Sequence, residues 1–278
     1  MSYGLTFNEA PRDAVERVRR QQLEAAAEAL EAGDDPVEGI HDARKRIKKT
    51  RALLRLARPG LRTKAYRRRN RALRDAGRGM SGTRDADVLV ETVDLLAERF
   101  VGQRPQSFFA AIREPLARDA HGSAGTGEHA ATLRGLAQEA WPLKGLDADA
   151  LADSLKRTYV RGRKAFARAE RKPSTTNLHE WRKRVKDLWY QERLLEDTWP
   201  GVMKAQAREA KKLSKLLGED HDLAVLADQF QDPELHELID ARRAELQAEA
   251  RALGRRVYAE RPKAFARRAH RYLDLAAA

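Results

Sequence analysis

Basic side chains recur at helical spacing in the segment that begins at residue 41. The basic residues of this segment are His41, Arg44, Lys45, Lys48, Arg51 and Arg55. In a helix, each residue turns by about 100°, so this spacing places all six on one face. Guanidinium and ammonium groups bind phosphate oxygens, and an imidazole N–H donates to them whether the ring is neutral or charged. The pattern therefore predicts a helix face that binds an anion.

The same pattern occurs a second time. The run His41-Asp-Ala-Arg-Lys-Arg-Ile-Lys aligns without gaps with His179-Glu-Trp-Arg-Lys-Arg-Val-Lys, and every His, Arg and Lys is identical. The second band consists of His179, Arg182, Lys183, Lys186 and Arg193. Trp189 departs from the pattern, because Arg51 stands at the matching position of the first copy. A repeat of this kind predicts two structural units of similar geometry.

A basic stripe follows each of these segments. Arg67, Arg71, Arg74 and Arg78 align with Lys204, Arg208, Lys211 and Lys215. Each set spans about 60° of arc on a helix. Like charges at i,i+4 spacing repel and weaken an isolated helix, so a solvent-exposed stripe is an unfavourable arrangement. We expect the bands and stripes to face one shared cavity, where they would concentrate a positive field.

Acidic residues mark the third match, which aligns Arg84-Asp85-Ala-Asp87-Val88-Leu89 with His221-Asp222-Leu-Ala224-Val225-Leu226. Paired carboxylates suit a metal site or a general base. They also suit a helix N-terminus, where acids accept from free N–H groups and interact with the helix dipole. We favour the helix terminus. The sequence has no glycine-rich phosphate loop and no compact metal motif, so we expect no catalysis, no cofactor and no metal site.

The elements that must position these residues are all helices. The chain is rich in Ala, Leu, Glu, Lys and Arg and shows no alternating strand pattern. Expected helices cover residues 8–32, 36–58, 63–80, 84–100, 147–171, 173–199, 202–217, 220–230 and 233–275, the first capped by Asn8 and the last broken at Pro262. Gly218-Glu219 is expected to end a helix. Residues 102–145 are expected to be less regular, with a loop at 122–127 and helical pieces on either side of it that end near Trp141-Pro142. We expect one all-α domain of two duplicated halves, 1–142 and 143–278, around a basic cavity.

Charge and composition narrow the partners. The chain has 278 residues with 55 Lys and Arg against 42 Asp and Glu, a net charge of +13. This favours nucleic acid, anionic lipid or free polyphosphate. The absence of Cys excludes disulfides, thiolate zinc sites and Cys nucleophiles. The sequence shows no signal peptide and no apolar run of about 18 residues, so we expect a cytoplasmic protein that does not enter membranes.

The aromatic content separates two of these ligands. Proteins that bind single-stranded nucleic acid usually offer aromatic side chains for base stacking. This chain is only 6% aromatic, and Trp189 alone interrupts the basic patterns. A linear phosphate polymer carries dense charge and needs no stacking surface. The sequence therefore favours inorganic polyphosphate over nucleic acid, with a metal-dependent phosphohydrolase that uses Asp85 or Asp222 as a third alternative.

At these residues the sequence resembles the CHAD family, the conserved histidine α-helical domain. The resemblance covers nearly the whole chain and rests on the repeated His-x-x-Arg-Lys-x-x-Lys segment, the basic stripes and Arg-Asp-x-Asp-Val at 84–88. It implies two pseudo-symmetric four-helix bundles that meet at a basic central cavity, polyphosphate binding there and association with polyphosphate granules. The implied ligand contacts are His41, Arg44, Lys45, Lys48, Arg51, Arg71, Arg74, Arg78, His179, Arg182, Lys183, Lys186, Arg208, Lys211 and Lys215. Divalent cations carried by the polyphosphate stay open as further partners, and the oligomeric state is not predicted.

The two repeated histidines predict a pH dependence. With an ordinary pKa near 6.5, His41 and His179 would gain charge as the pH falls from 8 to 6. We therefore expect polyphosphate to bind more tightly at mildly acidic pH.

Overall fold

The computed structural model describes residues 3–32, 35–80, 84–119 and 126–277, excluding the side chains of 84–86 and 119. Throughout this part of the chain the protein is all-α, without a β-strand, as the composition predicted. The α-helices are α1 (Pro11–Glu31), α2 (Pro36–Leu56), α3 (Thr63–Gly79), α4 (Arg84–Arg99), α5 (Gln106–Asp119), α6 (Thr126–Gln138), α7 (Ala148–Arg171), α8 (Thr175–Leu194), α9 (Pro200–Gln229), α10 (Pro233–Val257) and α11 (Pro262–Ala277). Short 3₁₀ turns follow α2 and α8, at Arg58–Gly60 and Glu196–Thr198.

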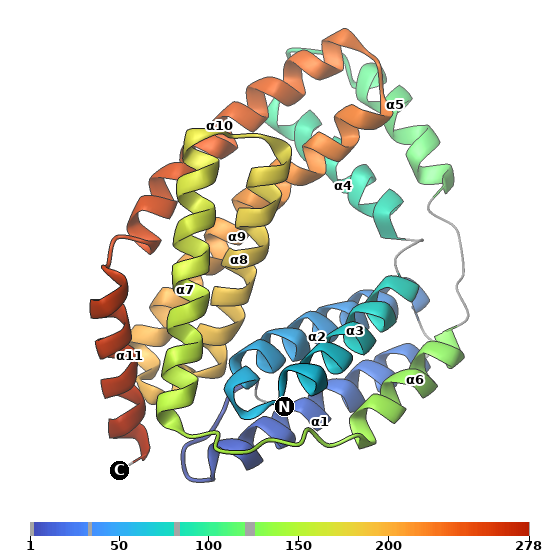
Figure 1. Ribbon diagram of the computed structural model, residues 1–278. Helices are drawn as coiled ribbons and strands as arrows, with labels where there is room; N and C mark the ends of the chain where they lie inside the picture. Colours follow the sequence, from blue (N-terminus) through green and yellow to red (C-terminus); the bar gives the residue numbers. More distant parts are fainter. Residues whose placement is uncertain (1–2, 33–34, 81–83, 120–125, 278) are drawn as a thin grey trace.

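The helices form two bundles with the same internal contacts. In the first bundle, α1 packs against α2 and α6, and α2 packs against α3. In the second, α7 packs against α8 and α11, and α8 packs against α9. Figure 1 shows the first bundle in blue, cyan and green at the lower right, and α7 and α8 of the second bundle standing upright to its left. The expected division near residue 142 falls in the segment that connects α6 to α7.

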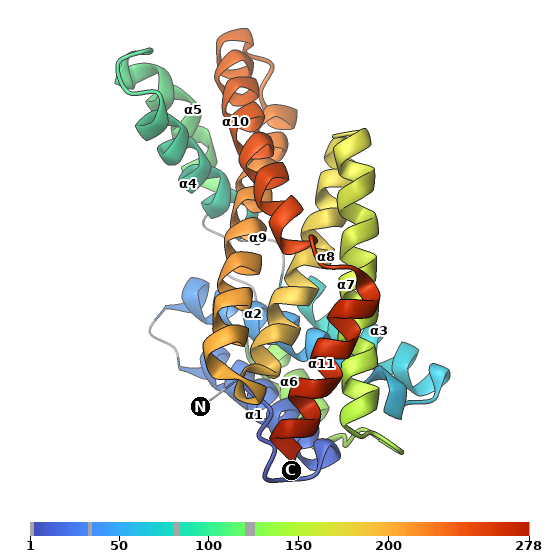
Figure 2. The ribbon, with the colours of Figure 1, turned by 90° about the vertical axis from the view of Figure 1, so that its left-hand side faces the viewer.

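Helices α4 and α5 leave the first bundle and pack beside the second. They pack against each other, and α4 also contacts α9 and α10. Figures 1 and 2 both show α4 and α5 beside the upper parts of α9 and α10. This crossing brings a helix of the first half against the helix that carries the second basic stripe.

The apolar faces of α2 and α8 form much of the core. Ile47 and Leu54 on α2 and Val185 and Leu188 on α8 are almost fully buried. Burying one such side chain stabilises the fold by about 1.5–3 kcal/mol. Trp181 is also fully buried. Because each residue turns by about 100° along a helix, these buried side chains lie on a different face of α2 and α8 from the basic bands.

The segment before α1 joins the two bundles. The backbone N–H of Leu5 donates to the carbonyl of Leu194 at the end of α8, at 2.8 Å. The ring of Tyr3 lies edge-on to Tyr190, with centroids 6.2 Å apart. Both Tyr3 and Leu5 are buried. These contacts hold the end of α8 against the first half of the chain.

Helix α9 corrects one prediction. Gly218-Glu219 does not end a helix, because α9 continues without a break from Pro200 to Gln229. A glycine inside a helix costs about 1 kcal/mol relative to alanine. Here Gly218 is buried, and a Cβ at this position would lie 3.3 Å from Nη2 of Arg182. The glycine therefore gives the Arg182 guanidinium room to lie against α9.

The start of α1 also differs from the prediction. Asn8 is not the N-cap; the helix begins at Pro11, with Ala10 in the cap position and no side-chain cap. Proline suits this position because it lacks the N–H that would be left unpaired in the first turn. The fixed backbone angle of Pro11 thus replaces the hydrogen bond that Asn8 was expected to supply.

Helices α5 and α6 are the helical pieces expected within residues 102–145, and Pro115 lies inside α5. Of the loop predicted at 122–127, Thr126 and Gly127 begin α6, and the rest lies outside the described residues.

Glu192 is an acid in the core of the second bundle. Its side chain is 4% exposed, and Leu54 stands at the matching position of the first half. Its Oε2 has no hydrogen-bond partner among the described residues. Burial raises the pKa of this carboxyl to about 8, so the side chain is mostly protonated at neutral pH.

We predict that Glu192→Gln makes stability less sensitive to alkaline pH. Between the unfolded-state pKa near 4.5 and the folded-state pKa near 8, only the folded chain holds the proton, so stability falls as the pH rises through this window. The amide resembles the protonated acid but does not titrate. Urea unfolding measures the free energy of unfolding of both proteins at pH 6 and pH 9. The value for the variant, relative to the parent, should be about 2 kcal/mol higher at pH 9 than at pH 6. An equal difference at both values would contradict this assignment.

Candidate functional site

Three cavities share walls: two lie where the two bundles meet, and the third lies between α4 and the second bundle. The central cavity, about 600 Å³, is lined by His41, Arg44, Lys45, Lys48, Val88, Leu89, Arg182, Lys186, Trp189, Tyr190, His221, Asp222, Val225 and Gln229. The α3-side cavity, about 570 Å³, is lined by Arg44, Ile47, Lys48, Arg51, Arg55, Leu73, Arg74, Gly77, Arg78, His179, Glu180, Arg182, Lys183, Arg184, Lys186, Asp187 and Tyr190. The α9-side cavity, about 590 Å³, is lined by Val88, Glu91, Thr92, Leu95, Leu96, Arg182, Lys186, Trp189, Lys211, Ser214, Lys215, Gly218, Glu219, Asp222, Leu223 and Arg242. Arg182 and Lys186 of α8 border all three, so the cavities adjoin one another.

Most of the residues predicted from the repeat line these cavities. They are His41, Arg44, Lys45, Lys48, Arg51 and Arg55 of α2, Arg74 and Arg78 of α3, His179, Arg182, Lys183 and Lys186 of α8, and Lys211 and Lys215 of α9. The structure thus brings basic side chains from four helices and from both halves together.

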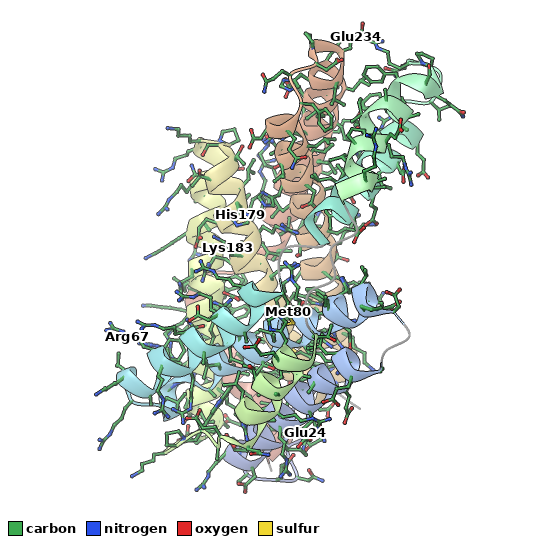
Figure 3. The ribbon with its side chains drawn as sticks, turned by 90° about the vertical axis from the view of Figure 1, so that its right-hand side faces the viewer. Glu24, Arg67, Met80, His179, Lys183 and Glu234 are labelled. Atoms are coloured by element: carbon green, nitrogen blue, oxygen red, sulfur yellow. The ribbon has the colours of Figure 1, made fainter. Side chains whose placement is uncertain are left out.

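The remaining predicted residues lie outside the linings of these three cavities: Arg67, Arg71, Arg193, Lys204 and Arg208. In each stripe, the first two positions lie outside the linings and the last two lie within them. In Figure 3, Arg67 lies at the outer edge of the molecule, away from His179 and Lys183. Lys204 pairs instead with Glu196 at 3.5 Å, and the Arg193 guanidinium lies 5.4 Å from the ring centroid of Tyr3.

One acid fixes neighbouring cations in each copy of the band. Asp42 pairs with Lys45 at 2.9 Å and with Arg46 at 2.5 Å, at i+3 and i+4 spacing. Glu180 occupies the same place on α8 and pairs with Arg184 at 3.0 Å. Such pairs stabilise a helix by a few tenths of a kcal/mol each. Their larger effect is to orient part of the basic band.

Asp187 lies between the two halves. Its side chain is buried and forms ion pairs with Arg55 of α2 at 3.1 Å and with Arg184 at 3.2 Å. Lys49 stands at the matching position of the first half. Burial, together with cations that include Arg193, lowers the pKa of Lys49 to about 8. The negative charge of Asp187 therefore offsets part of the repulsion among the cations around it, which include Arg55 and Arg184.

Two histidine rings lie against each other, tilted, beside the cavities. The rings of His179 and His221 have centroids 4.2 Å apart, at 39°. The pKa of His179 is lowered to about 4. Burial is the largest cause, and the nearby His221, Lys183 and Arg182 lower the pKa further. Burial and Arg182 also lower the pKa of His221. The ordinary pKa assumed for His179 is therefore wrong, and this ring is neutral between pH 6 and 8.

Several polar atoms of this region have no hydrogen-bond partner among the described residues. They include Nη1 of Arg44, Nε of Arg182, and Nδ1 of His179 and His221, all shielded from solvent. A buried polar group without a partner costs about 1–3 kcal/mol. The arginine nitrogens can only donate, and a neutral imidazole can present an N–H at either nitrogen. These atoms are suited to the oxygens of an anion.

The acids at 85, 87 and 222 do not share one role. The prediction of a helix N-terminus is wrong for Asp222, because this residue lies inside α9. Its Oδ1 is 4.0 Å from Nη1 of Arg182. Burial raises its pKa despite the nearby Arg182. Oδ2 of Asp87 is buried without a partner among the described residues, and the side chain of Asp85 lies outside them. In the part of the chain that is described, no group of three or more acids and histidines is placed to hold a metal ion.

Sequence reasoning missed two cavity residues of chemical interest. His221 lines the central cavity, and its alignment with the basic Arg84 was a signal that it belonged to the site. Arg242 reaches the α9-side cavity from α10, and no repeated pattern marks it.

Among the described helices, none is long and apolar enough to cross a bilayer.

The duplicated bundles and the cationic cavities between them define a class of helical proteins that comparison with known families identifies. The model of the CHAD domain matches residues 14–231. The chain belongs to the CHAD domain family. It is similar to the crystal structure of the CHAD domain from the plant Ricinus communis, with a TM-score of 0.57 and 18% identity over 94% of each chain. At this identity the likeness shows the fold alone. No curated protein matches the sequence.

We predict that His179→Gln makes stability less sensitive to acid. The folded-state pKa near 4 lies below the ordinary value of 6.5, so the unfolded chain takes up this proton first as the pH falls. The parent protein therefore loses stability between about pH 6.5 and 4. The variant should lose about 2–4 °C less in Tm between pH 7 and pH 5. Parallel Tm curves for the two proteins would refute the lowered pKa.

Proposed function

We propose that this protein binds inorganic polyphosphate, or a similar linear polyanion, in the three adjoining cavities and catalyses no reaction. The observation that carries the proposal is the convergence of basic side chains from α2, α3, α8 and α9 on cavities that share Arg182 and Lys186. A compact anion would occupy one cavity. A chain of phosphates can continue from one cavity to the next past these two shared residues.

The balance of charge supports an anionic ligand. The α3-side cavity is lined by ten Lys and Arg side chains and only two acids, Glu180 and Asp187. Both acids already pair with Arg184, at 3.0 Å and 3.2 Å. Such an excess, inside low-dielectric walls, concentrates positive potential in the cavity. The partnerless atoms of Arg44 and Arg182 add donors that phosphate oxygens would satisfy.

Two alternatives have less support. Nucleic acid would also bind a cationic surface, but a single strand usually stacks successive bases on several aromatic side chains. Of the aromatic residues in the described part of the chain, only Trp189 and Tyr190 line these cavities, and they stack on each other with centroids 4.5 Å apart, so they offer one such surface at most. A phosphohydrolase would need a nucleophile or a metal, and Asp222 instead lies beside Arg182. Attachment of the protein to polyphosphate granules in the cytoplasm, and divalent cations carried by the ligand, would follow from the proposed binding.

Charge reversal at the cavities should weaken polyphosphate binding at least tenfold, because each charge-assisted contact contributes about 1.5–3 kcal/mol. The variants are Arg74→Glu and Lys211→Glu, measured by calorimetry at fixed salt. Their matched controls are Arg71→Glu on α3 and Lys212→Glu on α9, exposed residues outside the three linings. Circular dichroism should show unchanged helicity in all four. Equal losses in the variants and in their controls would place the ligand elsewhere.

Competition should separate polyphosphate from nucleic acid. Both ligands release counterions, so both should bind less tightly as salt increases. We expect long-chain polyphosphate to displace a fluorescent single-stranded RNA at equal phosphate concentration, and RNA to displace polyphosphate poorly. The opposite order would favour the nucleic-acid alternative. Release of phosphate from polyphosphate by the pure protein with Mg²⁺ would instead show an enzyme.

A further inference from the structure

The α9-side and α3-side cavities are partly related by the internal repeat. Positions matched by the repeat line both: Arg44, Lys48, Arg51, Arg74, Gly77 and Arg78 in one, and Arg182, Lys186, Trp189, Lys211, Ser214 and Lys215 in the other. In four of the six pairs, both residues carry a positive charge. The most marked chemical change is at the third pair, where Trp189 replaces Arg51. The duplication therefore provides an internal comparison of two sites built on one plan.

Trp189 changes what its cavity can hold. The indole stacks on Tyr190 with centroids 4.5 Å apart and planes at 22°, which fixes its orientation. The side chain is half-buried and lines both the central and the α9-side cavities. A partly exposed indole fixed in this way offers a flat apolar surface to a ligand, where Arg51 offers a charge.

Helix α4 adds a largely apolar wall to the α9-side cavity. Val88, Thr92, Leu95 and Leu96 line it, and none of these lines the α3-side cavity. The central cavity shares only Val88 of this wall. Leu95 is 47% exposed, which is unusual for a leucine in this chain. Because burial of apolar surface is favourable, a ligand group that covers Leu95 and Trp189 would gain affinity that phosphate alone cannot gain.

The charges of the α9-side cavity are also more nearly balanced. Glu219 pairs with Arg242 at 3.2 Å and lies 3.9 Å from Lys215. Asp222 lies 4.0 Å from Arg182. Glu91 is a third acid of this lining and exposes a hydrogen-bond acceptor. The positive charge is therefore strongest in the α3-side cavity and weaker where the apolar wall begins.

We propose that the α9-side cavity binds the base of a nucleoside polyphosphate, with Trp189 and Leu95 against the ring and the phosphates directed past Arg182 and Lys186 toward the other two cavities. The volume of about 590 Å³ is within the usual range for small-molecule sites, about 300–1,000 Å³. This inference rests on the proposed function, because the phosphates occupy the same cationic cavities. It adds an organic end group to the ligands that the protein recognises.

Comparing ATP with tripolyphosphate tests the inference. Both contain three phosphates, and the inorganic chain carries more negative charge, so a purely electrostatic site would prefer it. Calorimetry in EDTA at fixed salt should instead show ATP binding about tenfold more tightly, in line with the stacking of one base on an aromatic side chain. Adenosine alone should bind far more weakly than ATP, since it lacks the phosphates.

Two variants locate the base. Trp189→Leu and Leu95→Asn should each lower the ratio of ATP affinity to tripolyphosphate affinity, the tryptophan variant by about tenfold. Their matched controls are Trp199→Leu and Leu275→Asn, which change exposed residues outside the three linings and should keep the parent ratio. Leu95 is exposed, so its variant tests the site even if the tryptophan variant fails to fold.

The outcomes separate the two proposals. If the parent binds tripolyphosphate at least as tightly as ATP, the base site is refuted and polyphosphate binding stands. If ATP is preferred but neither variant lowers the ratio, the base does not bind in this cavity, and the inference is again overturned. If neither ATP, tripolyphosphate nor long-chain polyphosphate binds, both the inference and the proposed function are wrong.

Discussion

Repulsion among cations is the interaction that the rest of this structure must overcome. Two unit charges 4 Å apart repel by about 1 kcal/mol in water and by about 4 kcal/mol at the effective dielectric near a protein surface. The lowered pKa values of Lys49 and His179 both record burial and the nearby positive charge. The opposing free energy comes from the other face of the same helices, where Ile47 and Val185 are buried. Each of α2 and α8 thus stabilises the fold with one face and presents charge with the other.

Acidic residues direct this charge rather than cancel it. Asp42 and Glu180 occupy matched positions and hold cations at i+3 or i+4 spacing, so the orientation of the bands is part of the repeat. Asp187 belongs to one half only and joins the halves through Arg55. Because a buried ion pair gives little net stability, its consequence is positional: α2 and α8 are held with their basic faces toward the same cavities. Apolar packing alone would hold the helices together without fixing the direction of their charged side chains.

The sequence predicted the helices and their basic faces because both follow from local periodicity. Period, caps and prolines indicated most helix bounds, and the repeated bands and stripes predicted that four helical faces would lie near one another. The sequence could not show where the helices diverge, and so Arg67 and Lys204 were assigned to a cavity that their helix turns do not reach. Gly218 does not end α9 but lies where a Cβ would come within 3.3 Å of Arg182 on another helix, a packing constraint that no local pattern records. Arg242 comes from an unrepeated helix, so its contribution depends on tertiary packing alone.

The two halves share a backbone plan but not a charge distribution. Three matched positions of α2 and α8 differ in charge: Asp187 replaces Lys49, Trp189 replaces Arg51 and Glu192 replaces Leu54. The first two changes remove positive charge from the second half, and the third adds an acid that burial keeps mostly protonated at neutral pH. A linear anion along the cavities would therefore meet a field that is strongest beside α3 and weaker beside α4. A symmetric pair of bundles would bind either end of such a chain equally, whereas this unequal pair gives the two ends of a ligand different surroundings.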